Sequence, residues 1–438
     1  MVGWVEHCIF WHVFPLRFVG AEPERLPADR EPEHRLGRLE VWLDYLIELG
    51  ASGLLLGPIF ESGSHGYDTA DYFRIDRRLG DEADFDALVV AARERGIRVV
   101  LDGVFNHVGR GFEPFQRAIA DPNAPEGELF SLYWNTPGAE PDYEHFEGHD
   151  TLVTLNHRSP AVVDLVVDVM CHWLERGADG WRLDAAYAMD PEFWALVLPR
   201  VRERFPDAYV VGEVIHGDYA DFVARSGADS VTQYELWKAS WSAINDHNLF
   251  ELAWTLKRHD ELLDTFVPLT FVGNHDVSRI ATQITDPTHL AHALVVLFTV
   301  AGTPCVYSGD EQGFRGTKTQ RPGGDDEVRP AFPESPSELS TLGRPVYDLH
   351  AQLIGLRRRH PWLHGARLTE VHVANEQLVY RCTDGSRSLT VGLNLADDAA
   401  RVPAPGVRIV LIGGAHLDGA GDATEITLPA HGWAVLDH

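Results

Sequence analysis

The sequence predicts an α/β protein whose main body is a (β/α)8 barrel, or TIM barrel. Eight short apolar runs are bounded by Gly, Pro or Asp, as buried strands are, and helical patterns separate most of them. Strands that alternate with helices form a parallel sheet, and eight such units over about 350 residues can close it into a barrel. The eight runs are Cys8–Phe14, Gly53–Pro58, Arg98–Val104, Asp179–Leu183, Tyr209–Gly212, Ser230–Gln233, Leu269–Val272 and Pro304–Tyr307.

The segments between these runs carry the helical period. In one of them the apolar residues recur every three or four positions and predict a helix with one buried face: Leu36, Leu39, Leu43, Leu46 and Leu49. An open doubly wound sheet would have the same alternation of elements. It is less favoured, because no glycine-rich phosphate-binding turn follows the first run.

Two segments depart from this alternation. Residues 109–154 are rich in Pro, Gly, Glu and aromatic residues where a helix should follow the third strand, which predicts a small inserted domain. After a helix at Arg344–Arg359, short alternating runs separated by turns predict a C-terminal antiparallel β-sandwich over 361–438. The barrel would then comprise 1–108 and 155–360. The strands expected in the sandwich include Leu378–Arg381, Leu389–Leu393, Val407–Leu411 and Thr424–Leu428.

Composition excludes several classes of partner. The chain has 438 residues, 45% of them hydrophobic, which is enough for a large buried core. Its 37 Lys and Arg against 66 Asp and Glu give a formal net charge of −29, which repels nucleic-acid phosphates and anionic lipids. We therefore expect neither nucleic acid nor a membrane surface as a partner.

The start of the chain and the cysteines indicate the compartment. The first residues, Met1–Cys8, do not form the basic start and apolar stretch of an export signal, and no apolar run approaches the length of a membrane span. The four cysteines lie far apart without CxxC spacing, as reduced buried thiols do: Cys8, Cys171, Cys305 and Cys382. We expect a cytoplasmic protein.

Polar residues that end the apolar runs are the candidates for chemistry, because the active site of a (β/α)8 barrel lies at the carboxyl ends of its strands. Each such residue alone is as well explained as a helix cap or a structural side chain. Several carboxylates on one face cost stability through repulsion and desolvation, so their convergence indicates a function. The four carboxylate-bearing ends are Asp102–His107, Gly180–Asp184, Gly212–Glu213 and Gly273–Asp276.

These motifs, in this order, resemble those of glycoside hydrolase family 13, the α-amylase family. The resemblance extends over the barrel, the insertion and the sandwich, and it is closest to the neopullulanase and cyclomaltodextrinase group. Four further segments share it: Cys8–Phe18, Gly66–Tyr72, Thr151–Asn156 and Tyr307–Glu311.

The resemblance implies a retaining glycoside hydrolase that acts by double displacement. Asp184 would be the nucleophile, Glu213 the general acid/base, and Asp276 a third carboxylate that binds sugar hydroxyls and helps to distort the ring. This chemistry needs one protonated acid and one ionised carboxylate about 5–5.5 Å apart. Arg182, two residues before Asp184 on the same strand face, would keep Asp184 ionised, while the neighbouring carboxylates would keep Glu213 protonated.

The resemblance also implies a set of side chains that bind or orient the sugar. They are Tyr67 by stacking, His107 and His275 by donated hydrogen bonds, Asp102 through Arg182 or Tyr67, and Arg329 on the non-reducing side of the substrate.

No cofactor is expected, and no obligatory metal. Many family members hold calcium between the barrel and the insertion with the Asn of the third-strand motif and a His four residues after the nucleophile. Asn106 is present here, but the second position is Ala188. Calcium prefers six to eight oxygen ligands. The insertion offers only uncertain donors: Asp142, Glu144, Glu147 and Asp150.

The expected substrates are linear or cyclic malto-oligosaccharides cleaved at α-1,4 bonds, with α-1,6 cleavage left open and some transglycosylation. The alternatives are an α-1,6-specific glucosidase or a glucosyltransferase of the same family and, more remotely, a member without catalytic activity. The presence of all three carboxylates speaks against the last. The first predicted strand begins near Met1, without the extra N-terminal domain that helps neopullulanase-like members to dimerise, so a monomer and a homodimer both stay open.

Overall fold

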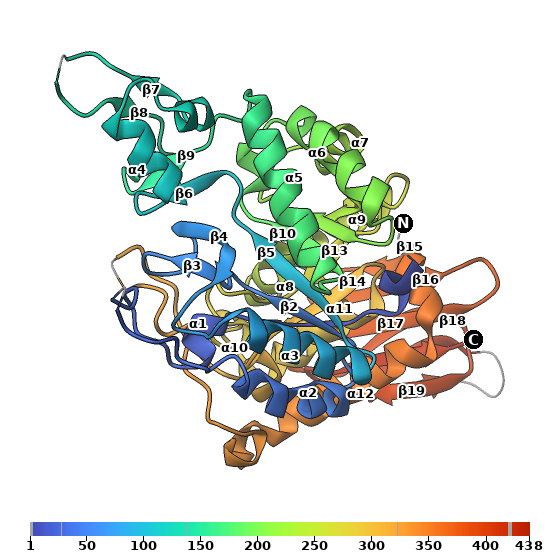
Figure 1. Ribbon diagram of the computed structural model, residues 1–438. Helices are drawn as coiled ribbons and strands as arrows, with labels where there is room; N and C mark the ends of the chain where they lie inside the picture. The colour runs from blue at the N-terminus through green and yellow to red at the C-terminus, as the bar shows by residue number, and fades with distance from the viewer. Residues whose placement is uncertain (1–2, 28, 137, 322, 419–422) are drawn as a thin grey trace.

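The computed structural model describes residues 3–27, 29–136, 138–321, 323–418 and 423–438, and its centre is an eight-stranded parallel barrel (Figure 1). The strands follow the order β12-β11-β10-β5-β2-β1-β14-β13, and a parallel bridge between Thr232 and Leu269 joins the two end strands. The predicted (β/α)8 barrel is therefore confirmed. Its strands are β1 Phe10–Val13, β2 Gly53–Leu56, β5 Arg98–Gly103, β10 Gly180–Leu183, β11 Tyr209–Gly212, β12 Ser230–Val231, β13 Leu269–Phe271 and β14 Thr303–Tyr307.

All eight predicted strands are present, most of them with shorter bounds. The run at Tyr209–Gly212 is correct to the residue, whereas Cys8–Phe14 shrinks to Phe10–Val13. The cause is local: the peptide N–H of Cys8 donates to the carbonyl of Val5 in a turn, and Phe14 precedes helix α1 at Pro15–Phe18. Met1 and Val2, the first residues of the expected barrel segment, lie outside the described residues.

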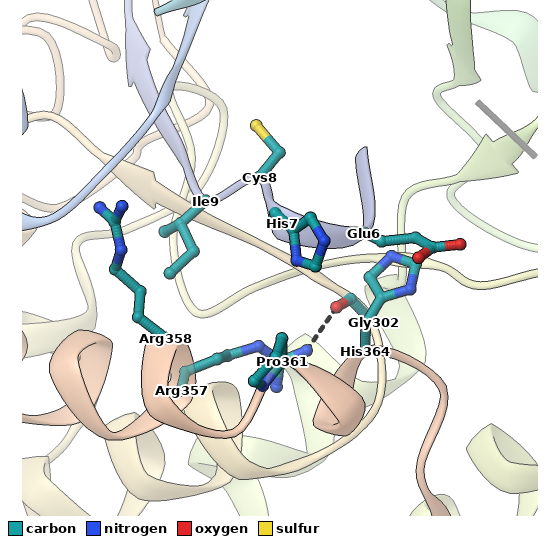
Figure 2. Close-up of a pocket in the computed structure, with 9 residues that line it drawn as sticks. All are labelled: Glu6, His7, Cys8, Ile9, Gly302, Arg357, Arg358, Pro361 and His364. Atoms are coloured by element: carbon teal, nitrogen blue, oxygen red, sulfur yellow. Dashed lines mark hydrogen bonds between the residues drawn. The ribbon is translucent and has the colours of Figure 1, made fainter. Parts of the chain in front are cut away.

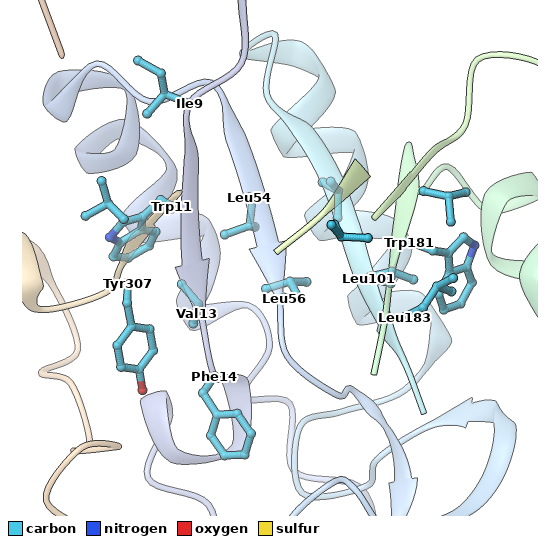
Figure 3. Packing of buried hydrophobic residues seen from close by; sticks show 14 of the residues in the cluster. Ile9, Trp11, Val13, Phe14, Leu54, Leu56, Leu101, Trp181, Leu183 and Tyr307 are labelled. Atoms are coloured by element: carbon cyan, nitrogen blue, oxygen red, sulfur yellow. The ribbon is translucent and has the colours of Figure 1, made fainter. Parts of the chain in front are cut away.

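Alternate residues of each barrel strand pack into two separate apolar cores. Phe10, Leu55 and Val100 belong to a cluster inside the barrel. Trp11 and Leu54 belong to the larger cluster between strands and helices, shown in Figure 3. Successive strand side chains point to opposite faces, so each strand of a parallel barrel is buried on both sides.

The inner row of side chains becomes polar toward the carboxyl ends of the strands. His12 lies two residues after Phe10, and Asp102 lies two residues after Val100, so both point to the inside of the barrel. Arg182 lies on the inner face of β10. All three are buried. Strand periodicity alone therefore brings charged groups into the mouth of the barrel.

Helices cover the outside of the barrel (Figure 1). The predicted leucine face appears in α2, Arg38–Leu49, and every one of its leucines is buried. The helix ends at Gly50, which takes the left-handed conformation, φ 97°, that favours glycine at this position. The other helices around the barrel are α3 Glu82–Glu94, α5 Pro160–Glu175, α6 Pro191–Arg204, α7 Tyr219–Ser226, α8 Tyr234–Asn245, α9 Leu249–Leu262, α10 Ile280–Gln283, α11 Leu290–Thr299 and α12 Arg344–Arg359.

A small insertion follows the third barrel strand, as predicted. It starts and ends on an antiparallel ribbon in which His107 pairs with Thr154 and Gly109 with Leu152. In Figure 1 it projects from one end of the barrel. Its elements are β6 His107–Gly109, α4 Glu113–Ala120, β7 Leu132–Tyr133, β8 Asp142–Tyr143 and β9 Leu152–Thr154, and a separate hairpin of β3 Phe60–Ser62 and β4 Thr69–Ile75 precedes it in the chain.

The C-terminal β-sandwich is also confirmed. A five-stranded sheet faces a three-stranded one, and an apolar cluster that includes Val379, Val402 and Ile426 fills the space between them. The first sheet contains β15 Arg367–Val373, β16 Gln377–Thr383, β17 Ser388–Asn394, β22 Trp433–Asp437 and β19 Ile409–Gly413, and the second contains β18 Ala400–Val407, β21 Ala423–Leu428 and β20 His416–Asp418.

One predicted strand of the sandwich is wrong. The run Val407–Leu411 is not continuous, because β18 ends at Val407 and β19 begins at Ile409. The two strands belong to different sheets, and the chain crosses between the sheets at Arg408. Apolar residues continue across this crossing because both sheets bury side chains in the same core.

The thiols match the sequence prediction. All four cysteines are free and buried. Within the described part of the chain, no helix has both the length and the apolar character needed to cross a bilayer.

Arg357 lies buried at the amino-terminal end of the barrel, beside a cavity of about 210 Å³ (Figure 2). Its guanidinium donates to three backbone carbonyls in and after the last turn of helix α11, those of Phe298 (3.1 Å), Val300 (2.6 Å) and Gly302 (2.5 Å). No acidic side chain of the described residues pairs with it, and burial lowers its pKa to about 10. The cation thus satisfies carbonyls that the end of a helix leaves free.

Arg357→Met should lower the free energy of unfolding by about 2–3 kcal/mol, because three buried carbonyls lose a charged donor. Urea denaturation followed by tryptophan fluorescence measures the change. Arg358→Met is the control, since Arg358 makes one exposed bond, to the carbonyl of Gly50, and should change stability by less than about 0.5 kcal/mol. Equal effects of the two substitutions would contradict this role of Arg357.

Candidate active site

The strand ends bring the predicted charged residues to one end of the barrel. Asp102 lies on β5 and Arg182 directly opposite it on β10. Asp184 and Glu213 follow β10 and β11, and Asp276 follows β13. The first four are buried, with at most 8% of each residue exposed.

The guanidinium of Arg182 is the centre of this group. Its Nη1 lies 2.7 Å from both carboxylate oxygens of Asp102 and 3.3 Å from Oδ1 of Asp184. Its Nη2 lies 2.7 Å from Oε1 of Glu213. One cation therefore contacts three carboxylates, and the fork of the guanidinium fixes their relative positions.

One guanidinium does not balance three buried carboxylates. Burial, and then the adjacent Glu213, raise the pKa of Asp184 well above its usual range, and Arg182 only partly opposes the shift. Burial also raises the pKa of Asp102 against the same cation. The ionised form of Asp184 is therefore disfavoured beside Glu213 at this depth. Arg182 acts on Asp184 in the predicted direction but does not outweigh burial and Glu213, because the cation lies closer to Asp102 and Glu213 than to Asp184.

Glu213 is held by three further groups. The Tyr234 hydroxyl donates to its Oε1 at 3.0 Å, and the side-chain amide of Asn274 donates to that hydroxyl at 2.9 Å. The peptide N–H of Ala185 donates to Oε2 at 3.1 Å. Ala185 has a φ of 46°, a conformation that is costly for a residue other than glycine and that recurs at functional sites.

Sequence reasoning missed Tyr234 and the role of Asn274. A signal existed for both: Asn274 stands inside the motif that ends the seventh strand, and Tyr234 follows closely after the sixth. The bond between them depends on the neighbouring positions of those strands in the barrel, which sequence spacing does not give.

Tyr67, His275 and Asp276 form a second connected group. The Tyr67 hydroxyl donates to Oδ2 of Asp102 at 3.1 Å and closely contacts Nε2 of His275. That nitrogen lies 2.9 Å from Oδ2 of Asp276. The expected bond between Asp102 and either Arg182 or Tyr67 is confirmed for both partners.

Asp276 stays ionised. Burial alone would raise its pKa, but His275, then Arg329 and Arg182, hold the pKa of this carboxyl well below its usual range. The Arg329 guanidinium contacts Oδ1 of Asp276 at 2.7 Å and Oδ2 of Asp325 at 2.9 Å, and its Nε donates to the carbonyl of His275 at 2.9 Å. Arg329 therefore positions Asp276, a role that sequence reasoning did not assign to it.

Both ring nitrogens of His107 are bonded within the protein. Its Nε2 donates to the carbonyl of Tyr67 at 3.1 Å, and its Nδ1 accepts from the side chain of Asn106 at 3.1 Å. The ring also stacks on Phe146 of the insertion. In this conformation His107 orients the backbone of Tyr67 and connects it to the insertion.

A cavity of about 530 Å³ opens beside these groups, with a mixed aromatic and charged lining. Asp184 and Glu213 are not among its lining residues, in keeping with their low exposure. Aromatic faces beside carboxylates and guanidinium groups suit a polyhydroxylated ligand with apolar ring faces. The lining includes Phe14, Tyr67, Phe146, Asp276, Asp325 and Arg329.

The carboxylates of the insertion do not fit a calcium site. Asp142 accepts from Asn135, Glu144 from Tyr133, and Glu147 from Tyr187, so these side chains point to three different partners. Within the described residues, no group of three metal-ligating side chains includes any of them. That the protein needs no metal stays a prediction.

Comparison with known proteins decides the family. The sequence matches the family described as "Alpha amylase, catalytic domain" over residues 36–363. The chain belongs to the α-amylase family. It is therefore a glycoside hydrolase, and its barrel, insertion and sandwich are those of that family.

Individual α-amylase family proteins align over nearly the whole chain. A cyclomaltodextrinase of Geobacillus thermopakistaniensis is 30% identical over 465 residues, covering 99% of this chain and 77% of that protein. The solved cyclic α-maltosyl-(1→6)-maltose hydrolase of Arthrobacter globiformis has a TM-score of 0.83 at 27% identity, covering 99% of each chain. A debranching enzyme of Nostoc punctiforme has a TM-score of 0.84 at 25% identity, covering 100% of this chain and 99% of that one.

Tyr234→Phe should lower kcat of this α-amylase family enzyme about ten- to hundredfold with a smaller change in KM, because Glu213 loses a hydrogen bond worth about 1.5–3 kcal/mol. Steady-state kinetics on maltotriose measure the effect. Tyr209→Phe is the matched control, because it removes a buried hydroxyl on β11 that bonds to neither Asp184 nor Glu213 in the described part of the chain. A kcat loss equal to that of the control would show that Tyr234 only fills space.

Proposed function

We propose that the protein is a retaining α-glucan hydrolase in which Asp184 is the nucleophile and Glu213 the general acid/base. The observation that carries this proposal is the shared guanidinium of Arg182, which contacts both carboxylates at 3.3 and 2.7 Å. Two carboxylates on neighbouring strand ends, held by one cation, are the parts that double displacement requires.

In the first step a carboxylate oxygen of Asp184 attacks the anomeric carbon. The bond from that carbon to the glycosidic oxygen breaks, and Glu213 gives its proton to the departing oxygen. In the second step Glu213 takes a proton from water, whose oxygen displaces Asp184 and yields a sugar with the original α configuration. A sugar hydroxyl in place of water gives transglycosylation.

Double displacement requires an ionised Asp184 and a protonated Glu213 when the substrate is bound. Arg182 Nη1 contacts Oδ1 of Asp184 at 3.3 Å and partly offsets the cost of ionising that carboxylate. The carboxylate of Asp276 is ionised and 35% exposed, so it can accept hydrogen bonds from sugar hydroxyls. Tyr67, held by His107 and Asp102, would stack on the sugar ring. His275 would donate its Nε2 proton, which now points to Asp276, to a sugar hydroxyl as well.

Small linear or cyclic malto-oligosaccharides are the proposed substrates, with α-1,6 as well as α-1,4 bonds. The cavity is of the size that suits a small ligand. Two of the solved relatives that match the chain end to end are a hydrolase of a cyclic α-1,6-containing sugar and a debranching enzyme. An α-1,6-specific glucosidase or glucosyltransferase is the alternative that the substrate panel below distinguishes.

Asp184→Asn should abolish turnover of every substrate, because an amide cannot form the glycosyl ester. Glu213→Gln should lose activity on maltotriose but keep much of the first step with a nitrophenyl α-glucoside, whose leaving group needs no proton. Pre-steady-state release of nitrophenol measures that step. If Glu213→Gln slows it as severely as it slows maltotriose cleavage, the assignment of Glu213 as the acid is wrong.

The value of kcat/KM should be at least about tenfold higher for a small oligosaccharide than for starch, per chain, equivalent to roughly 1.4 kcal/mol of transition-state binding. The panel is maltotriose, β-cyclodextrin, pullulan, soluble starch and a cyclic tetrasaccharide with α-1,6 bonds, with products separated by chromatography. Comparable values on starch would indicate an open cleft. Cleavage of α-1,6 bonds alone would move the assignment to the α-1,6-specific alternative.

A further inference from the structure

Histidines gather where the C-terminal sandwich meets the barrel. His289 precedes α11 and His292 lies within it, while His431 lies in the turn between β21 and β22. His289 Nε2 and His431 Nδ1 face each other at 3.0 Å, although 142 positions separate the two residues in the chain. His292 bonds to the carbonyls of Asn394 and Gly432 in the sandwich.

A carboxylate completes the group between His289 and His431. Ligand atoms of Asp286, His289 and His431 all lie within 4.8 Å of one another. His289 is buried, and a ring nitrogen of a neutral imidazole that carries no proton offers a lone pair to a metal. Two imidazoles and a carboxylate are the donor set that Zn²⁺ and similar transition metals prefer.

Two of these ligands have further contacts within the protein. His431 Nε2 lies 3.2 Å from Oδ1 of the exposed Asp397, and its Nδ1 faces His289. Oδ1 of Asp286 accepts from the peptide N–H and the hydroxyl of Thr288. Carboxylate support behind a ligating imidazole is a common arrangement around bound zinc.

The backbone is also held against its preference at this junction. Only four described residues other than glycine have positive φ, and two of them are His431 (50°) and His247 (49°), whose ring packs on the edge of His289. Such a conformation costs free energy, which the interactions made by the side chains it orients can offset.

We propose that Asp286, His289 and His431 bind a transition-metal ion of the Zn²⁺ class, which clamps the C-terminal sandwich to the barrel. In a tetrahedral site with bonds of about 2.0–2.1 Å, neighbouring ligand atoms lie about 3.3 Å apart, so the two nitrogens need to move only slightly. A water molecule would take the fourth position. None of the three ligands lines the substrate cavity, so the site is structural and does not depend on the proposed reaction.

The test uses full-length protein stripped with a chelator and then titrated with ZnCl₂ alone. One tight site should appear in calorimetry, and the melting temperature should rise by about 3 °C when free Zn²⁺ is a hundredfold above its Kd. His431→Gln and Asp286→Asn should each lose that rise, whatever their metal-free melting temperatures. Asp286→Asn is included because His431→Gln also removes a contact within the junction.

His34→Gln is the control, because His34 with Asp81 and Asp84 forms the other such group among the described residues, on an exposed surface. This variant should keep the Zn²⁺-dependent rise in melting temperature. The tetrahedral visible spectrum of the Co²⁺-substituted protein should likewise vanish in the two junction variants and stay in His34→Gln. No Zn²⁺-dependent rise in the wild type, or an equal rise in the junction variants, would overturn the proposal and leave an ordinary hydrogen bond between two histidines.

Discussion

The site depends on a single buried cation. Arg182 stands on the inner face of β10, where strand periodicity would otherwise place an apolar side chain, and it contacts Asp102, Asp184 and Glu213 together. Without this cation, three carboxylates at this depth would repel one another and lack solvation. The folded state would then be less stable by several kcal/mol. With it, all three carboxylates contact one cation, which reduces their mutual repulsion.

The features that the sequence predicted correctly follow from local rules. Buried parallel strands are short and apolar on both faces, so their number and order are visible in the chain, and the barrel follows from that order. Polar residues at strand ends stand out against apolar runs, which is why Asp102, Asp184 and Glu213 could be named in advance. The error at Val407–Leu411 arose where the same apolar signal served two sheets, because periodicity does not mark the residue at which a chain changes layer.

What escaped prediction depends on contacts between distant segments. Tyr234 and Asn274 meet only because β12 and β13 are neighbours in the closed barrel, and Arg329 reaches Asp276 from a loop 53 residues away. A donor that bonds within the protein is also not available to a sugar. The ring nitrogen of His107 and the guanidinium of Arg329, which were expected to bind the sugar, are already bonded within the protein. A sequence shows which donors exist, whereas the fold decides how each one is used.

The closure of the barrel rests on its weakest pairing. β12 has only two residues. A single bridge between Thr232 and Leu269 joins it to β13, together with the hydrogen bond from the peptide N–H of Gln233 to the carbonyl of Leu269. Tyr234, the residue that steadies Glu213, comes directly after this seam. Brief separation of the two strands costs few hydrogen bonds and is the kind of local opening that proteins undergo without unfolding. The hydrogen bond from Tyr234 to Glu213 therefore comes from the part of the barrel that has the fewest backbone hydrogen bonds between neighbouring strands.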